Sequence, residues 1–113
     1  MLKEALDFAN YQNTFTTQRK VLKEKISAKL TYGHNGGIFY IDHSLLTFVE
    51  MLCNNNRTSG IVLIDINNNP ILVEDLVSFK SEIFERYFEV TNEYYEKYQA
   101  LKRSRSIEKL LEQ

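Results

Sequence analysis

The side chains of this sequence that could together bind a transition metal are His34, Asp42, His43 and Cys53. Imidazole, carboxylate and thiolate groups are the usual zinc ligands, and structural zinc sites take them from closely spaced pairs. The spacing of these four residues matches no zinc pattern. We therefore predict no metal site and no cofactor, with His34 in a loop and His43 beside a helix cap.

Enzymatic chemistry would need a nucleophile or a pair of carboxylates. Cys53 is the only cysteine, and either histidine could serve as its base. It falls near the end of a predicted helix, where the helix dipole disfavours a thiolate, so we expect a small apolar side chain. Asp42 and Asp65 could form a carboxylate pair, but no neighbouring residue argues for it. We predict no catalytic residue, and an enzyme is the least favoured reading.

The stretch "IDINNNPILVEDL" at residues 64–76 allows two interpretations. Asp65 and the Asn carboxamides could supply oxygen ligands to calcium, but calcium loops need several closely spaced carboxylates and this one has one. Asn tolerates positive φ, and Pro70 suits the start of a returning strand. We therefore predict that Asn67 to Asn69 form the turn of a β-hairpin.

The glycines of "TYGHNGG" at residues 31–37 could suggest a phosphate-binding loop. Such loops lead from a strand into the N-terminus of a helix, where backbone N–H groups face the anion. Here the cluster follows a predicted helix and precedes a predicted strand. We therefore expect it to end the helix.

Charge is segregated along the chain, although the net charge is −1. A basic stretch at residues 18–30 and another at 97–109 flank an acidic stretch at 74–96. The basic stretches could contact phosphates, or their charges could face the acidic stretch or be solvated. The candidate phosphate contacts are Arg19, Lys20, Lys23, Lys102, Arg103 and Arg105.

The elements that must position these residues follow from hydrophobic periodicity. The sequence predicts an α+β fold in the order α-β-α-β-β-α, with long terminal helices packed on a small, mainly antiparallel three-stranded sheet and one short helix. We expect one domain over residues 1–113, with a frayed or mobile tail at 102–113. The predicted helices are 2–30, 45–52 and 76–101, and the predicted strands are 38–42, 61–66 and 70–74.

The last helix has the most regular pattern. Asp75 is its predicted N-cap, and apolar residues recur at steps of three and four at 76, 79, 83, 87, 90, 94, 98 and 101. A second row lies about 100° further around and widens the apolar face beyond what one neighbour covers. We therefore predict a homo-oligomer, most simply a dimer, whose interface contains Phe84, Phe88, Tyr95 and Tyr98.

Composition sets the general class. Apolar residues make up 43% and charged residues 26%, as is usual for a globular protein. No stretch reaches the roughly 18 apolar residues of a membrane span, and the N-terminus "MLKEALDFAN" carries acids unlike a signal peptide. We expect a cytoplasmic protein with no membrane partner.

Residues 37–106, from "GIFYIDHSLLTFVE" to "ALKRSRS", contain a strand, a short helix, an Asn-rich hairpin with Pro70 and a Tyr-rich helix. This run resembles small uncharacterised proteins of T4-like tailed phages, especially marine ones. The resemblance implies a phage-encoded protein in the host cytoplasm, with a phage or host protein as partner. It implies no activity.

These observations favour a non-enzymatic assembly or adaptor protein that acts through helix-mediated oligomerisation. The alternative is a nucleic-acid-associated accessory factor that uses the basic helix face and the basic C-terminal end.

Overall fold

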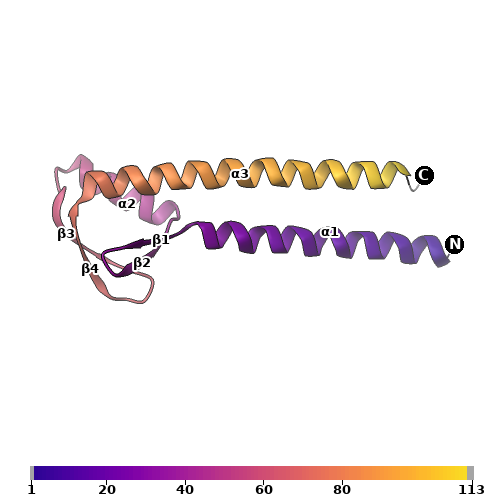
Figure 1. Cartoon of the computed structure of the whole chain (residues 1–113), viewed down its shortest axis with the longest axis horizontal. Helices are drawn as coiled ribbons and strands as arrows, with labels where there is room; N and C mark the ends of the chain where they lie inside the picture. The colour runs from indigo at the N-terminus through magenta and orange to yellow at the C-terminus, as the bar shows by residue number, and fades with distance from the viewer. Residues whose placement is uncertain (1, 112–113) are drawn as a thin grey trace. The chain divides into compact units, whose positions relative to one another are not determined.

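The computed structural model describes the backbone of residues 2–111 and the side chains of residues 2, 3 and 14–104 (Figure 1). It contains helices and strands in the order α1 (Leu2–Lys29), β1 (Thr31–His34), β2 (Gly37–Tyr40), α2 (His43–Asn54), β3 (Ser59–Ile64), β4 (Pro70–Asp75) and α3 (Leu76–Leu111). None of the described helices is both long and apolar enough to cross a lipid bilayer.

The predicted α+β class is confirmed, but the predicted three-stranded sheet is wrong. The described strands form two antiparallel two-stranded sheets, β1–β2 and β3–β4. The sequence reading missed β1, because it treated residues 31–37 as a helix terminator. The observed order is therefore α-β-β-α-β-β-α, with the extra strand directly after α1.

The chain divides into two compact units, which are described separately. One unit is Ser27–Val90, with both sheets, α2 and the first part of α3. The other contains the described residues of 2–26 and 91–111, which are helical. The expectation of a single domain over the whole chain stays a prediction.

The β1–β2 hairpin is closed by a two-residue turn. Thr31 pairs with Tyr40, and His34 pairs with Gly37 at the turn. Asn35 and Gly36 have φ values of 49° and 80°. Asn-Gly is the residue pair most suited to a turn with two positive φ values, because neither residue meets a large steric penalty there. The glycine cluster therefore makes a hairpin besides ending α1.

The predicted β3–β4 hairpin is confirmed. Ile61 pairs with Val73 and Ile64 pairs with Pro70 in an antiparallel ladder. Residues 65–69 form the connecting turn, closed by a 3.0 Å hydrogen bond from the Asp65 backbone N to the Asn69 carbonyl O. The left-handed position in this turn is held by Asn68, with a φ of 61°.

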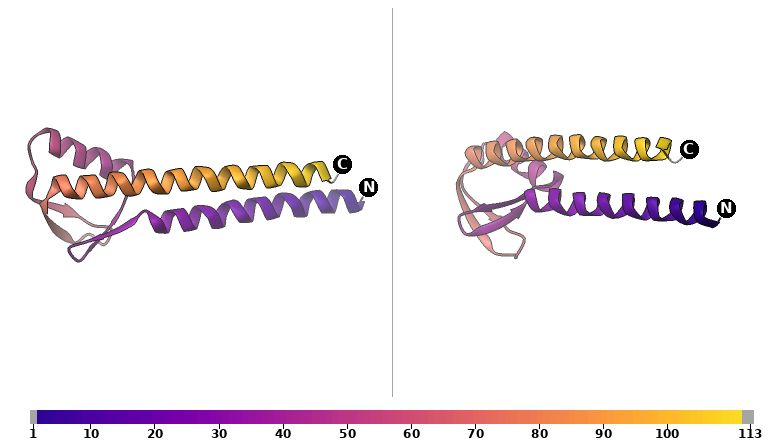
Figure 2. Two further views of the ribbon diagram at one scale, coloured as in Figure 1. Left: turned by 45° about the horizontal axis from the view of Figure 1, so that its top comes forward. Right: turned by 45° about the vertical axis from the view of Figure 1, so that its right-hand side comes forward.

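The core of the Ser27–Val90 unit lies between the two hairpins and two helices. Figure 2 shows from two further sides that α2 and both hairpins lie around the first turns of α3. The predicted stripe of α3 is buried there at Leu76, Phe79, Ile83 and Val90. The other fully buried large side chains are Ile41, Val49 and Val73. The periodicity of the last helix therefore predicted its core face correctly.

The caps of the helices agree with their sequence signals. The Asp42 carboxylate accepts from the backbone N of Leu45 at 2.9 Å, which makes it the N-cap of α2. Asp75, the predicted N-cap of α3, accepts from the backbone N of Ser78 at 3.2 Å and from the Ser78 hydroxyl at 2.8 Å. These hydrogen bonds, led by that from the hydroxyl, lower the pKa of Asp75.

Both long helices are continuous. The β-branched segment at 13–17 does not interrupt α1, and α3 continues through residues 102–106 to Leu111. The Glu93 and Lys97 side chains form an i,i+4 ion pair at 2.7 Å in α3, of a kind that stabilises helices modestly. Residues 112–113 of the expected mobile tail lie outside the described residues.

Candidate functional site

The first aromatic group of α3 lies in the Ser27–Val90 unit. The ring of Phe84 lies 6.3 Å from the ring of Phe88, and the ring of Phe88 lies 6.0 Å from that of Tyr87. Phe84 is half-buried, whereas 57% of Phe88 is exposed to solvent. An exposed phenylalanine beside other rings offers apolar surface to solvent.

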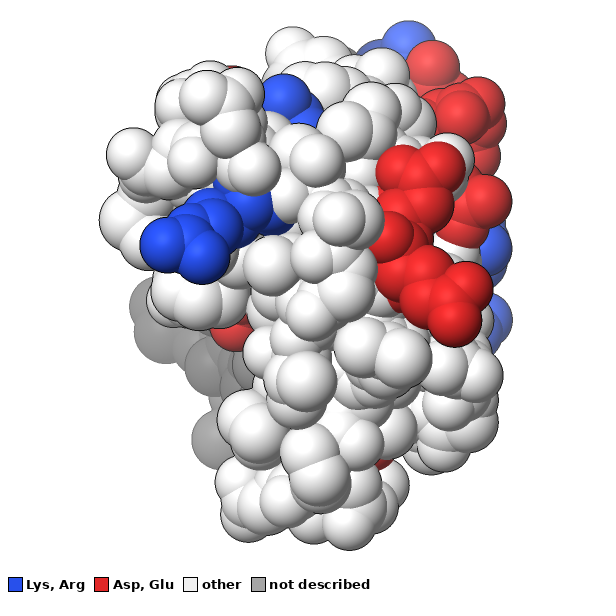
Figure 3. Space-filling model, turned by 90° about the vertical axis from the view of Figure 1, so that its left-hand side faces the viewer, with Lys and Arg blue, Asp and Glu red and all other residues white. Residues whose placement is uncertain are grey.

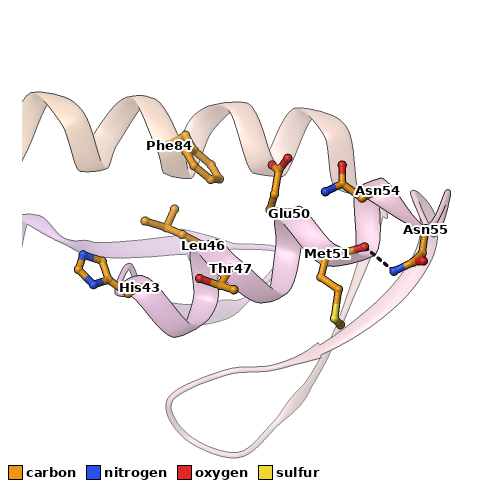
Figure 4. Close-up of a pocket in the computed structure, with 8 residues that line it drawn as sticks. All are labelled: His43, Leu46, Thr47, Glu50, Met51, Asn54, Asn55 and Phe84. Carbon is orange, nitrogen blue, oxygen red and sulfur yellow. Dashed lines mark hydrogen bonds between the residues drawn. The ribbon is translucent and has the colours of Figure 1, made fainter.

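A hollow between α2 and α3 adjoins this group. Figure 4 shows Phe84 of α3 facing α2, with Leu46 of α2 below it and polar side chains around the edge. Its apolar lining comes from Leu46, Met51 and Phe84, and Met51 is exposed. The polar lining residues are His43, Thr47, Glu50, Asn54 and Asn55. The hollow therefore combines an apolar base with hydrogen-bonding groups at its rim.

Two side-chain contacts fix the walls of this hollow. The Nε2 atom of His43 lies 2.6 Å from the Tyr87 hydroxyl oxygen, within hydrogen-bond distance. Glu50 of α2 and Lys80 of α3 form an ion pair, and the hydrogen bond between them raises the pKa of Lys80. Both contacts join α2 to α3, so they hold the spacing of the two helices at this place.

The second aromatic group of α3 lies in the other unit. The rings of Tyr94 and Tyr98 are 6.4 Å apart, and the Nζ atom of Lys102 lies 5.1 Å from the centre of the Tyr98 ring. Tyr95 is 65% exposed, and with Tyr94, Tyr98 and Thr91 it lines a shallow apolar hollow. Tyrosine suits an interface because its ring packs while its hydroxyl stays hydrated.

The four residues considered as metal ligands have other surroundings. The ring of His34 packs against Phe79 at 5.1 Å and stacks on Tyr32 at 6.2 Å. Asp42 caps α2, and His43 contacts Tyr87, as described above. Cys53 is a half-buried free cysteine. Within the described residues, no three His, Cys, Asp or Glu side chains lie close enough to share a metal ion.

Asp65 has a role that the sequence reading did not find. Only 6% of this residue is exposed, and its carboxylate accepts three backbone N–H groups. The Oδ1 atom accepts from Asn67 at 3.0 Å and Asn69 at 2.8 Å, and the Oδ2 atom accepts from Ile38 at 3.1 Å. These hydrogen bonds, led by that from Asn69, lower the pKa of Asp65. Asp65 therefore builds the Asn turn and joins it to β2.

Acidic side chains gather on one surface, and Figure 3 shows a patch of Asp and Glu on the face that it presents. In the Ser27–Val90 unit, Glu82 lines one hollow with Glu74 and Asp75, and a second hollow with Glu85 and Glu89. Arg86 beside them donates to the backbone carbonyl of Lys29 at 3.3 Å. The acidic stretch predicted from the sequence is therefore a surface feature.

The candidate phosphate contacts lie in the unit with residues 2–26 and 91–111. Arg19, Lys20 and Lys23 of α1 are exposed, as are Lys102 and Arg103 of α3. Lys102 also lies over the Tyr98 ring, a cation–π arrangement. The side chain of Arg105 lies outside the described residues. The exposed cations on α1 are accessible to an anionic partner.

A further surface was missed by the sequence reading. Strand β3 alternates between buried and exposed apolar residues, with Leu63 buried, Val62 56% exposed and Ile64 61% exposed. A strand with one face against water usually carries polar residues on that face. The run "IVLI" is apolar at every position, so it lacks the polar residues expected on an exposed face. This was the sequence signal for an exposed apolar surface.

No family model, no curated protein and no solved structure matches this chain.

Proposed function

We propose that this chain is a non-enzymatic assembly or adaptor protein that self-associates through the aromatic surface of α3. The proposal rests on the exposure of two large aromatic residues of α3, Phe88 in the Ser27–Val90 unit and Tyr95 in the other unit. Aromatic residues of this kind contribute strongly to protein interfaces, because their burial removes large apolar areas from water.

The half-buried members of the proposed interface support the same conclusion. Phe84 and Tyr98 each line a hollow beside the exposed rings. A hollow next to a protruding aromatic side chain suits a self-complementary interface, in which each copy inserts a ring beside the other copy's hollow. The partner proposed here is a second copy, most simply in a dimer.

The proposed cellular setting follows from the resemblance of residues 37–106 to proteins of T4-like tailed phages. On that basis we propose a phage-encoded protein in the host cytoplasm, where a phage or host protein would bind the assembled form. The resemblance carries no activity, and the proposal assigns none.

Light scattering coupled to size-exclusion chromatography tests the assembly. The wild-type protein at micromolar concentration is expected to show twice the mass of one chain. Replacing Phe88 and Tyr95 together by Ser is expected to shift the protein to the mass of one chain with unchanged helical circular dichroism. The matched control replaces their exposed neighbours Glu89 and Glu96 by Ser and is expected to keep the higher mass. A wild-type protein with the mass of one chain would refute the proposal.

The alternative function is binding of nucleic acid, supported by the exposure of Arg19, Lys20 and Lys23 on one segment of α1. Phosphate contacts make binding fall steeply with salt, because each contact releases bound counterions. Replacing these three residues by Ala should then remove duplex DNA binding measured at low salt. The control, Lys97→Ala, changes a lysine paired with Glu93 and should leave that binding unchanged.

A further inference from the structure

The turn of the β1–β2 hairpin contains the single Asn-Gly pair of the sequence, Asn35-Gly36. Both residues are exposed to solvent, and both have positive φ values. A Cβ atom at Gly36 would meet no heavy atom within 4 Å, so the space around this residue is open. The side-chain amide of Asn35 is therefore followed directly by an unshielded backbone nitrogen.

An asparagine that precedes glycine can lose its amide group spontaneously, because glycine has no side chain to hinder attack by its backbone nitrogen. The Gly36 nitrogen loses its proton and forms a bond to the Cγ atom of Asn35. The bond between Cγ and Nδ2 breaks, and Nδ2 leaves as ammonia. Water then opens the succinimide ring at either of its carbonyl carbons. The product is aspartate or isoaspartate, and water is the only other reactant consumed.

The backbone N–H of Gly36 is available for this reaction. The last pair of the hairpin ladder is His34 with Gly37, so it lies outside the two turn residues. Within the described part of the chain, no hydrogen bond uses the Gly36 N–H. Every other asparagine of the sequence is followed by a residue that has a side chain, which hinders the same attack. The sequence and the turn therefore single out Asn35.

The side-chain amide of Asn35 also has a structural role that this reaction would remove. Its Nδ2 atom donates to the backbone carbonyl of Leu72 at 2.9 Å, so it links the first hairpin to β4. An ionised carboxylate only accepts hydrogen bonds, so neither product can donate to that carbonyl. Deamidation therefore removes a hydrogen bond that joins the two hairpins.

The surroundings of Asn35 oppose the new negative charge. Asn35 lines a hollow together with His34 and three acidic residues, Glu74, Asp75 and Glu82. Like charges that lie close together repel one another, and salt weakens the repulsion between exposed groups. The reaction also adds a negative charge to a chain whose net charge is already −1. A carboxylate at residue 35 should therefore weaken the contact between the hairpins most at low ionic strength.

We propose that Asn35 is a site of spontaneous deamidation, and that its conversion to aspartate or isoaspartate releases the β1–β2 hairpin from β4. Isoaspartate disturbs the turn more than aspartate does, because its backbone runs through the side chain and gains a carbon atom. A two-residue hairpin turn depends on its length, so the added atom breaks its geometry. This inference goes beyond the proposed function and does not depend on association through α3.

Tandem mass spectrometry of the digested protein tests the site. Folded wild-type protein, incubated in mildly alkaline buffer, should show at residue 35 the mass increase of an amide NH₂ replaced by OH, with both isomers present. The asparagines at 54–56 and 67–69 should convert at least several-fold less. Asn35→Gly keeps a residue suited to positive φ but has no side-chain amide, so it should show no mass increase there. No conversion at Asn35, or equal conversion at the other asparagines, would overturn the proposal.

Thermal unfolding tests the consequence. Asn35→Asp supplies the aspartate product directly, whereas Asn35→Gly removes the hydrogen bond to Leu72 without adding charge. Both variants should unfold several degrees below fresh wild type, and Asn35→Asp should be the lower of the two at low salt. Added salt should reduce the difference between them. Asn56→Asp, the same exchange at another exposed residue with positive φ, is the control and should change the midpoint little. An Asn35→Asp midpoint equal to that of wild type would overturn the proposal.

Discussion

The Oδ2 atom of Asp65 accepts a hydrogen bond from the backbone N of Ile38 at 3.1 Å. The two residues are 27 positions apart, so one carboxylate links the two hairpins. The Oδ1 atom of the same group holds the Asn turn. One side chain therefore fixes both the local turn and its position against β2.

Replacing Asp65 by Asn tests this link. Asn keeps an oxygen for the turn but places an amide donor against the N–H of Ile38, so the hairpin link is lost. We expect the thermal unfolding midpoint at pH 7 to fall by several degrees. Glu74→Gln, at an exposed carboxylate of β4, is the control and should change the midpoint little. Equal midpoints for wild type and Asp65→Asn would contradict the role assigned to the link.

The pH dependence of stability should also report Asp65. Its folded pKa lies below the ordinary value of 3.8. A lowered folded pKa gives stability that is complete above the ordinary pKa and is lost as pH falls through the folded pKa. The free energy of unfolding of the wild type, measured with urea, should therefore decrease as pH falls from about 5 through the acid range. This loss should be smaller in Asp65→Asn, and an identical pH profile in both proteins would contradict it.

Gly37→Ala should destabilise the contact between the hairpins. A Cβ at this position would lie 2.7 Å from the Cδ1 atom of Ile71, closer than packed atoms tolerate. Overpacking of this kind costs about 1–3 kcal/mol of unfolding free energy, measured by urea unfolding. Gly33→Ala is the control, because its Cβ would have no neighbour nearer than 3.9 Å. A loss of unfolding free energy in Gly33→Ala but not in Gly37→Ala would contradict the close contact assigned to Gly37 and Ile71.

Phe79→Ala should give a large loss of stability. Its ring lies at the centre of an aromatic cluster, 5.3 Å from Phe39, 5.7 Å from Tyr32 and 5.1 Å from His34. Deleting a buried phenylalanine costs about 3–5 kcal/mol of unfolding free energy. Val77→Ala, at an exposed position of the same helix, should change it by no more than about 0.5 kcal/mol. Chemical denaturation followed by circular dichroism compares the two.

Asp42→Ala should cost about 0.5–2 kcal/mol through loss of the α2 N-cap. Ser44 also lies in the first turn of α2, but the structure assigns the cap to Asp42. Ser44→Ala should therefore leave the unfolding free energy nearly unchanged in the same urea experiment. A larger loss of unfolding free energy for Ser44→Ala than for Asp42→Ala would contradict the assignment of Asp42 as the N-cap.

Most of the fold could be predicted where one physical signal dominated. The apolar stripe from Leu76 to Val90 identified the core face of α3, because burial and helical periodicity agree there. The turn chemistry of Asn67 to Asn69 and Pro70 identified the second hairpin for a similar reason.

The first hairpin was missed because its signals conflicted. Strand β1 contains Gly33 and His34, which are poor markers of a strand, and the cluster follows a long helix. The Asn35-Gly36 pair was a valid hairpin signal, but helix termination explained the same residues. The role of Asp65 could not be predicted, since its third hydrogen bond comes from a residue far away in the chain.

One candidate surface could be predicted from the sequence and the other could not. The aromatic rows of α3 were visible as periodic patterns, and Phe88 and Tyr95 are indeed exposed. The exposure of Val62 and Ile64 on β3 depends on which side chains the hairpin register turns toward the core. Hydrophobic pattern alone does not fix that register.

The shared carboxylate of Asp65 has a consequence for how the two hairpins open. Because this group accepts from Ile38 of the first hairpin and from Asn67 and Asn69 of the second, opening either hairpin breaks hydrogen bonds of the other. The two hairpins should therefore behave as one cooperative unit, and their backbone amides should lose protection from hydrogen exchange together.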